Sequence, residues 1–129
     1  MFKEQTITVT PTFDTIKVQM IHTEATSAAK AAVATLLDKW NQQTGGNQYG
    51  EPMYCGFAWV DIKERSNSKL GKALKSIGFS SSHRSGVLQL WDPAQHRGQS
   101  MDCKEAGAMA YAGVWNNYGV NMSWGSRAD

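Results

Sequence analysis

The segment Cys55-Gly-Phe-Ala-Trp-Val-Asp-Ile62 decides the fold, because almost every residue in it is apolar. A continuous apolar run of this length is typical of a strand that is buried on both faces. Helical patterns lie on either side of it in the chain. One sheet with helices packed on it is the arrangement that buries all of these apolar surfaces together.

The chain after this strand predicts a short helix and another strand. Ser66 or Ser68 can cap the helix, its apolar stripe lies within residues 70–77, and Gly78 ends it. A serine-rich loop follows the glycine. The next strand covers Val87–Trp91, and an Asp-Pro pair directly after it stops the strand.

The C-terminal quarter predicts one more helix and one more strand. The helix starts at Asp102, with Glu105 three residues later in the arrangement of a capping box, and Gly119 ends it. Apolar and polar residues then alternate over residues 120–124, which is typical of a strand with one solvated face.

The N-terminal part predicts a hairpin and a long helix. Residues 6–10 and 16–20 alternate in polarity, and residues 11–14 supply a turn between them. Thr23 can cap an alanine-rich helix that ends at one of the glycines at 45 and 46. The predicted order is therefore β-β-α-β-α-β-α-β. We expect an α+β fold with a single mixed β-sheet of about five strands, some of them parallel, and three helices packed on it.

Composition agrees with one globular domain over residues 1–129. Hydrophobic residues make up 41% of the chain, enough for a core that needs no disulfide or metal. The first residues lack the apolar run of a signal peptide and no stretch reaches transmembrane length. We therefore expect a cytoplasmic protein with two free thiols and no contact with membranes. No cysteine–histidine set has zinc spacing and no cofactor motif is present, so we expect neither metal nor cofactor.

Local charge is the clearest anomaly, since the net charge of +2 is too small to imply nucleic-acid binding by itself. Lys69 and Lys72 share one face of the predicted short helix, whose start at Ser66-Asn67-Ser68 offers hydroxyl and backbone N–H groups. A cationic stripe beside such groups is what phosphate recognition requires. The alternative is an ordinary solvated helix face.

A second group of candidates surrounds the end of strand Val87–Trp91. Gln89, Trp91, Gln99 and Lys104 bring amide, indole and amine groups to a strand end and the next helix start, where α/β sheets place ligand groups. The alternative is that these residues belong to the core and to the helix cap. Arg127 follows the last strand and can clamp an anion at the sheet edge, or it can belong to a frayed tail.

Several strings in the C-terminal two thirds of the chain carry a resemblance. They include Cys55-Gly-Phe-Ala-Trp-Val, Gly86-Val-Leu-Gln-Leu-Trp-Asp-Pro, Gln99-Ser-Met-Asp and Ser126-Arg-Ala-Asp. From about Cys55 to the C-terminus the chain resembles a group of short uncharacterised proteins of tailed bacteriophages. The resemblance implies a phage source and an accessory role in the cytoplasm of the infected host. It implies no mechanism.

These observations favour a phage accessory protein that binds a small phosphate-bearing ligand, such as a nucleotide, without catalysing a reaction. The alternatives are a module that binds and inhibits a host protein and a nucleic-acid-binding protein that uses the basic segment 63–84. An enzyme is the remaining alternative, for which no nucleophile–base pair is recognisable. The oligomeric state and the strand order do not follow from the sequence.

Overall fold

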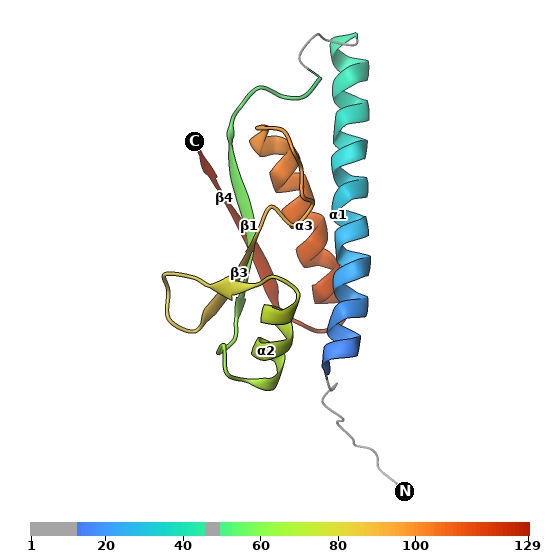
Figure 1. Cartoon of the computed structure of the whole chain (residues 1–129). Coiled ribbons are helices and arrows are strands. Elements are labelled where there is room, and N and C mark those ends of the chain that lie inside the picture. Colours follow the sequence, from blue (N-terminus) through green and yellow to red (C-terminus); the bar gives the residue numbers. More distant parts are fainter. Residues whose placement is uncertain (1–12, 46–49) are drawn as a thin grey trace, which may run out of the picture.

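A computed structural model describes residues 13–45 and 50–129 of the chain (Figure 1). These residues form three helices and four strands. In chain order the elements are α1 (Thr15–Thr44), β1 (Gly56–Lys63), α2 (Lys69–Ser76), β2 (Ser80–Ser81), β3 (Val87–Trp91), α3 (Met101–Asn117) and β4 (Met122–Ala128). The strand that was predicted over residues 6–10 lies outside the described residues.

The predicted strand over residues 16–20 is wrong, because these residues form the start of α1. Asp14 is the N-cap, and its side chain accepts a hydrogen bond from the backbone N–H of Lys17. Val18 is fully buried, whereas Ile16 and Met20 are 70% and 67% exposed. The alternation of Ile16, Val18 and Met20 with polar residues suggested a strand, but in a helix these three residues point to different sides. Thr23 is not a cap, since its hydroxyl bonds to the carbonyl of Gln19 within the helix.

The sheet has the strand order β2-β3-β1-β4, and all of its described pairs are antiparallel. The predicted parallel pairing is therefore wrong. A β-α-β crossover places β1 and β2 in the same direction, but β3 lies between them and prevents their pairing. The order β1-α2-β2-β3-α3-β4 is the split β-α-β arrangement, with α1 added before it. Strand β2 falls in the segment that we predicted to be a serine-rich loop.

The helices cover one face of the sheet (Figure 1). The strand register brings Ile62 of β1 next to Leu88 of β3 and Met122 of β4 on that face, and all three belong to the hydrophobic core. The next residues along each strand point the opposite way. Burial along β1 accordingly alternates between buried and partly exposed. The prediction that this strand is buried on both faces is wrong, because only its inner face is covered by helices.

The two shorter helices begin at serine caps. Ser68 caps α2 by accepting from the backbone N–H of Gly71, and Ser100 caps α3 by accepting from that of Cys103. The predicted start of the last helix at Asp102 is thus two residues late, and its cap is Ser100. Both helices contribute to the core, α2 through Leu74 and α3 through a fully buried Trp115.

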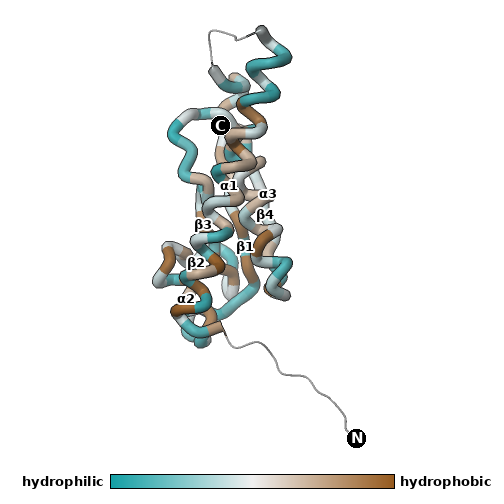
Figure 2. The backbone as a smooth tube through the Cα atoms, turned by 90° about the vertical axis from the view of Figure 1, so that its right-hand side faces the viewer, coloured by the Kyte–Doolittle hydropathy of each residue, from teal (hydrophilic) through white to brown (hydrophobic). Residues whose placement is uncertain are grey.

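The long helix α1 packs along α3 and extends past it at its C-terminal end (Figure 1). That end is mainly hydrophilic in Figure 2, in keeping with the sequence Asp38-Lys-Trp-Asn-Gln-Gln-Thr44. Within the described ranges, no helix combines the length and the apolar character that crossing a membrane requires.

Candidate functional site

The face of the sheet opposite the helices is not covered by any of them, and we call it the outer face. The strand register sets which side chains meet there. Trp59 lies opposite Trp91, and Asp61 lies opposite Gln89, across the two central strands β1 and β3. On the other side of β1, Phe57 lies opposite Arg127 of β4. Directly opposed residues of neighbouring strands share a face, so these six side chains form one surface.

Three aromatic rings form the centre of the outer face. The ring centroids of Trp59 and Trp91 are 4.7 Å apart, and those of Phe57 and Trp91 are 6.0 Å apart. Trp91 is 45% exposed, which is unusual for so large an apolar side chain. Gly125 of β4 gives the Trp59 indole room, since a Cβ atom at this glycine would lie only 3.0 Å from the ring. The indole of Trp59 therefore packs closely over Gly125 of β4.

The polar edges of both indoles are already bonded within the sheet. Trp59 Nε1 donates to Asp61 Oδ2 at 3.1 Å, and Trp91 Nε1 donates to Gln89 Oε1 at 3.3 Å. The second bond explains how Gln89 can be 91% buried in a strand, because its amide oxygen has a partner. With their N–H groups occupied, the indoles present ring faces rather than hydrogen-bond donors to a ligand.

Two arginines contribute positive charge to the outer face. The guanidinium carbon of Arg127 lies 5.7 Å from the centroid of Phe57, and within the described residues Arg127 has no ion pair. Arg84, in the loop between β2 and β3, reaches Asp61 Oδ2 at 3.4 Å while its side chain stays 55% exposed. Asp61 Oδ1 is buried and has no hydrogen-bond partner in the described part of the chain. The outer face thus combines one exposed and two partly exposed rings with two arginines and one carboxylate.

The structure places the predicted site residues in separate groups. Gln89, Trp91 and Arg127 all lie on the outer face. Lys104 is buried at the start of α3, where its ammonium donates to the carbonyl of Gly56 and lies 5.2 Å from the Phe57 ring. Lys104 therefore supports the outer face from behind and is not available to an external anion.

Lys69 and Lys72 do not join this surface. Both are exposed on α2, which packs against α1 on the helical side of the sheet. The predicted anion site at the start of α2 also contains a carboxylate, since the hydroxyl of the N-cap Ser68 donates to Glu64 Oε2. A negative charge at this position competes with any bound anion. The two lysines are exposed on α2 and do not converge with Gln89, Trp91 and Arg127.

Gln99 lies neither on the outer face nor on α2. It is next to a cluster of possible metal ligands. Its backbone N–H donates to Glu51, and Glu51 Oε1 lies 2.6 Å from Nε2 of His96. The thiol of Cys103 belongs to the same cluster. Burial raises the pKa of Cys103, and the charges of Glu51 and Asp102 raise it further, while a hydrogen bond with Ser100 lowers it. A thiol with a raised pKa and no exposed surface is not an activated nucleophile.

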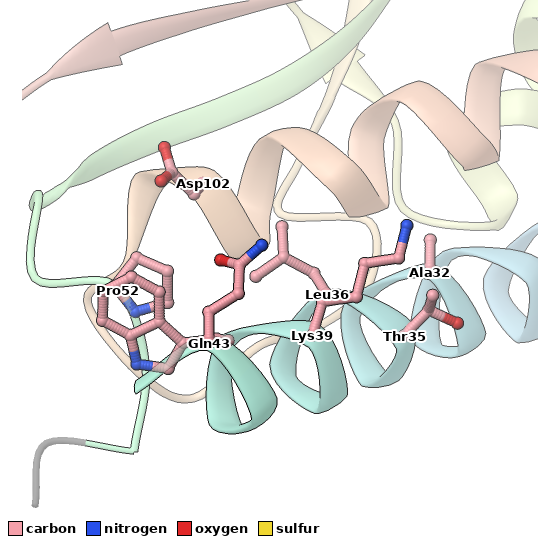
Figure 3. A pocket seen from close by; sticks show the side chains of 8 residues that line it. Ala32, Thr35, Leu36, Lys39, Gln43, Pro52 and Asp102 are labelled. Atoms are coloured by element: carbon pink, nitrogen blue, oxygen red, sulfur yellow. The ribbon is translucent and has the colours of Figure 1, made fainter. Parts of the chain in front are cut away.

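Two hollows of about 500 Å³ each lie in the described part of the chain, and neither includes the aromatic rings of the outer face. One of them lies between the C-terminal half of α1 and Pro52, with Asp102 of α3 nearby (Figure 3). Its lining is mostly apolar, and none of the seven predicted site residues contributes to it. The other is lined by Asp61 and Arg84 of the outer face and by Leu70 of α2, among others. The aromatic part of the outer face, with Phe57, Trp59 and Trp91, lines none of these hollows and is an open surface.

Sequence reasoning identified Trp91, Gln89 and Arg127 but not Phe57 as part of this surface. The available signal was the alternation of large aromatic residues, Phe57 and Trp59, with the small and branched residues that enter the core. We interpreted the whole run as apolar and so did not separate its two faces. Comparisons with protein-family models, with curated proteins and with solved structures give no match to this chain.

Proposed function

We propose that the outer face binds single-stranded nucleic acid, by stacking bases on its aromatic rings and pairing phosphates with its arginines. The observation that carries the proposal is the exposed Trp91 beside Trp59, next to the Arg127 guanidinium of β4, which has no ion pair among residues 13–45 and 50–129. Every base has a flat π-face, so stacking on tryptophan is tolerant of sequence and contributes about 1–3 kcal/mol per base. The proposal takes up the nucleic-acid alternative of the sequence analysis in place of the small phosphate-bearing ligand, and it uses the outer face rather than the basic segment 63–84 as the binding surface.

The shape of the surface favours a nucleotide chain over a single nucleotide. Small ligands are usually bound in concave sites that bury most of their surface. The hollows found in residues 13–45 and 50–129 include neither Trp91 nor Arg127. An open face instead allows the backbone of a longer strand to cross the sheet, so that several weak contacts add up. Arg127 lies opposite Phe57 near the start of β1, and Arg84 contacts Asp61 near its end, so the two arginines are placed to contact different phosphates of one strand.

The architecture supports the same proposal by analogy. Four-stranded sheets whose aromatic side chains stack roughly two or three bases are a common solution in RNA-binding modules. Here the aromatic residues also lie on the two central strands, β1 and β3, and the helices occupy the opposite face. The analogy concerns architecture alone, because one fold carries many functions. A phage source and an accessory role in the host cytoplasm stay predictions that accompany this proposal.

The test is a binding titration of the full chain with a fluorescently labelled DNA or RNA single strand, followed by anisotropy at several salt concentrations. We expect Trp91→Ala to weaken binding by about 5- to 150-fold, which corresponds to the loss of one stacked base. Trp124→Ala is the matched control, since Trp124 is also partly exposed on this sheet but lies opposite Val60 on the inner side. It should leave the affinity within about twofold of wild type.

Phosphate contacts are tested by the salt dependence of the same titration. Arg127→Ala should weaken binding to all sequences alike and reduce the slope of log K against log salt by about 1. Lys72→Ala, which removes a charge from α2, should not change the slope. The proposal is overturned if no single strand binds at low salt, or if binding depends on Lys72 and not on Trp91. Equal affinity for a mononucleotide and for a longer strand would instead support the small-ligand prediction.

A further inference from the structure

Three side chains that the proposed function does not use converge at the start of α3. Glu51 comes from the segment before β1, His96 from the loop between β3 and α3, and Cys103 from the first turn of α3. One carboxylate oxygen, one imidazole nitrogen and the thiol sulfur all lie within 4.8 Å of one another. They are the donor atoms of a transition-metal site, brought together from three separate segments.

The surroundings hold these donors in place before any metal binds. Glu51 Oε2 accepts hydrogen bonds from the backbone N–H groups of Gln99 and Ser100, at 3.0 and 3.1 Å, which turns Oε1 toward His96. Fixing the second oxygen of a ligating carboxylate in this way is typical of metal sites. The side chains of Glu51 and His96 are 24% and 13% exposed, whereas Cys103 is fully buried. The cluster therefore has a closed side and a side that reaches solvent.

Gly98 has no side chain, and the carboxylate of Glu51 occupies the space where one would lie. A Cβ atom at Gly98 would lie 2.1 Å from Glu51 Oε1, so no other residue fits there while Glu51 keeps its position. Gly98 and His96 also line a hollow of about 350 Å³ on the protein surface. The same loop thus makes room for one ligand, supplies another and borders an opening to solvent.

We propose that Glu51, His96 and Cys103 bind a zinc ion, with a water molecule in the fourth position. Zinc accepts sulfur, imidazole nitrogen and carboxylate oxygen as ligands at about 2.0–2.3 Å in tetrahedral geometry. Calcium and magnesium prefer sites made of oxygen alone, so the thiolate and the imidazole select against them. Three protein ligands leave one position open. On binding, the zinc ion replaces the proton of the Cys103 thiol, which is released to solvent, and it takes the position between Glu51 Oε1 and His96 Nε2 that their hydrogen bond now occupies.

The chain positions explain why zinc spacing was absent from the sequence. Glu51 and His96 are 45 residues apart, and they meet only because the sheet places the start of β1 beside the end of β3. In the folded chain the zinc ion would connect three segments that otherwise meet through hydrogen bonds. We therefore expect zinc to stabilise the fold, because an ion that binds only the folded state raises its stability.

The experiment uses the full chain, freed of metal by a chelator and titrated with Co²⁺ as a spectroscopic probe. We expect one equivalent to produce a thiolate-to-cobalt charge-transfer band and the visible bands of tetrahedral cobalt, which Zn²⁺ then removes. Cys103→Ser should abolish the thiolate band, and His96→Gln should weaken Co²⁺ binding at least about tenfold. The matched controls are Cys55→Ser and His83→Gln, which change an exposed cysteine and an exposed histidine outside the cluster.

A conservative variant keeps the test valid if Cys103→Ser does not fold. In Glu51→Gln the amide oxygen can still accept from the two backbone N–H groups, so the fold should persist while zinc affinity falls. Thermal unfolding should then show that Zn²⁺ raises the Tm of the wild type but not that of Glu51→Gln. The proposal is overturned if the wild type gives no thiolate band in excess Co²⁺, or if the band depends on Cys55 and not on Cys103. A Zn²⁺ shift in Tm that is equal in wild type and Glu51→Gln overturns it as well.

Discussion

Two glycines of α3 should respond in opposite directions to substitution by alanine, although they lie in the same helix. A Cβ atom at Gly107 would lie 2.6 Å from the Cβ of Ala94, in the loop that carries His96. Gly113 has nothing within 4 Å of the same position. Only the first glycine therefore marks a close approach between α3 and another segment.

Two contributions set the change in the free energy of unfolding. Both variants gain helix propensity, and only Gly107→Ala also pays for overpacking. Alanine has a higher helix propensity than glycine by about 1 kcal/mol, and both variants gain this amount. Ordinary contacts between carbon atoms are about 3.5–4.0 Å long, so Gly107→Ala creates an overlap of about 1 Å. Ala94 is 4% exposed, so the atoms packed around it leave its methyl group little room to move away. Overpacking of this kind costs about 1–3 kcal/mol.

We therefore expect Gly113→Ala to raise the free energy of unfolding by about 1 kcal/mol and Gly107→Ala to lower it by up to about 2 kcal/mol. Urea unfolding monitored by circular dichroism measures both, provided that the m-values are equal. The difference between the variants isolates the overpacking cost, because the propensity gain cancels. If Gly107→Ala is at least as stable as Gly113→Ala, then α3 does not pack closely against this loop and the described position of His96 is wrong.

Three further measurements test other parts of the structure. Burial lowers the pKa of His22 below its usual value of 6.5, so on acidification the unfolded chain binds a proton at His22 before the folded chain does. The free energy of unfolding should therefore fall as the pH drops below about 6.5, and it should level off once His22 titrates in the folded chain as well. Comparison with His22→Gln isolates this part of the pH profile. Leu74→Ala should cost about 2–5 kcal/mol in urea unfolding, because the side chain is fully buried, whereas Lys75→Ala should stay within about 0.5 kcal/mol. A thiol reagent should modify exposed Cys55 rapidly and Cys103 only upon unfolding, and equal rates would contradict the burial of Cys103.

Much of the fold could be predicted from local sequence patterns. The strand over Val87–Trp91 matches its predicted bounds, and β1, α2, α3 and β4 lie within a few residues of theirs. Each of these elements has a strong apolar pattern next to a serine cap, a glycine or a proline. The N-terminal helix was predicted correctly from residue 23 onward. Its first turns were not, because they expose Ile16 and Met20 to solvent and so lack the pattern of an amphipathic helix.

The sheet topology and the candidate site could not be predicted in the same way. Strand order depends on β3 lying between β1 and β2, and β2 has only two residues, too few for a pattern. The outer face depends on the register that pairs Trp59 with Trp91 and Phe57 with Arg127. The expected convergence of Lys69 and Lys72 with Gln89 failed for the same reason. Which side of a sheet a helix covers is a property of the whole fold.

The two proposed sites meet at the first turn of α3. Zinc binding and binding of a single strand can therefore affect each other through this turn. Cys103 points to the zinc cluster, while the next residue, Lys104, bonds to the carbonyl of Gly56 and lies over Phe57 of the outer face. If zinc ordered this turn, it would also order one of the three rings. Thermodynamic linkage then requires zinc to change the affinity for a single strand by the same factor as the strand changes the affinity for zinc. The coupling is established if each ligand raises the affinity for the other by the same factor and if this effect is lost in Glu51→Gln. If neither ligand changes the affinity for the other, the two sites are independent.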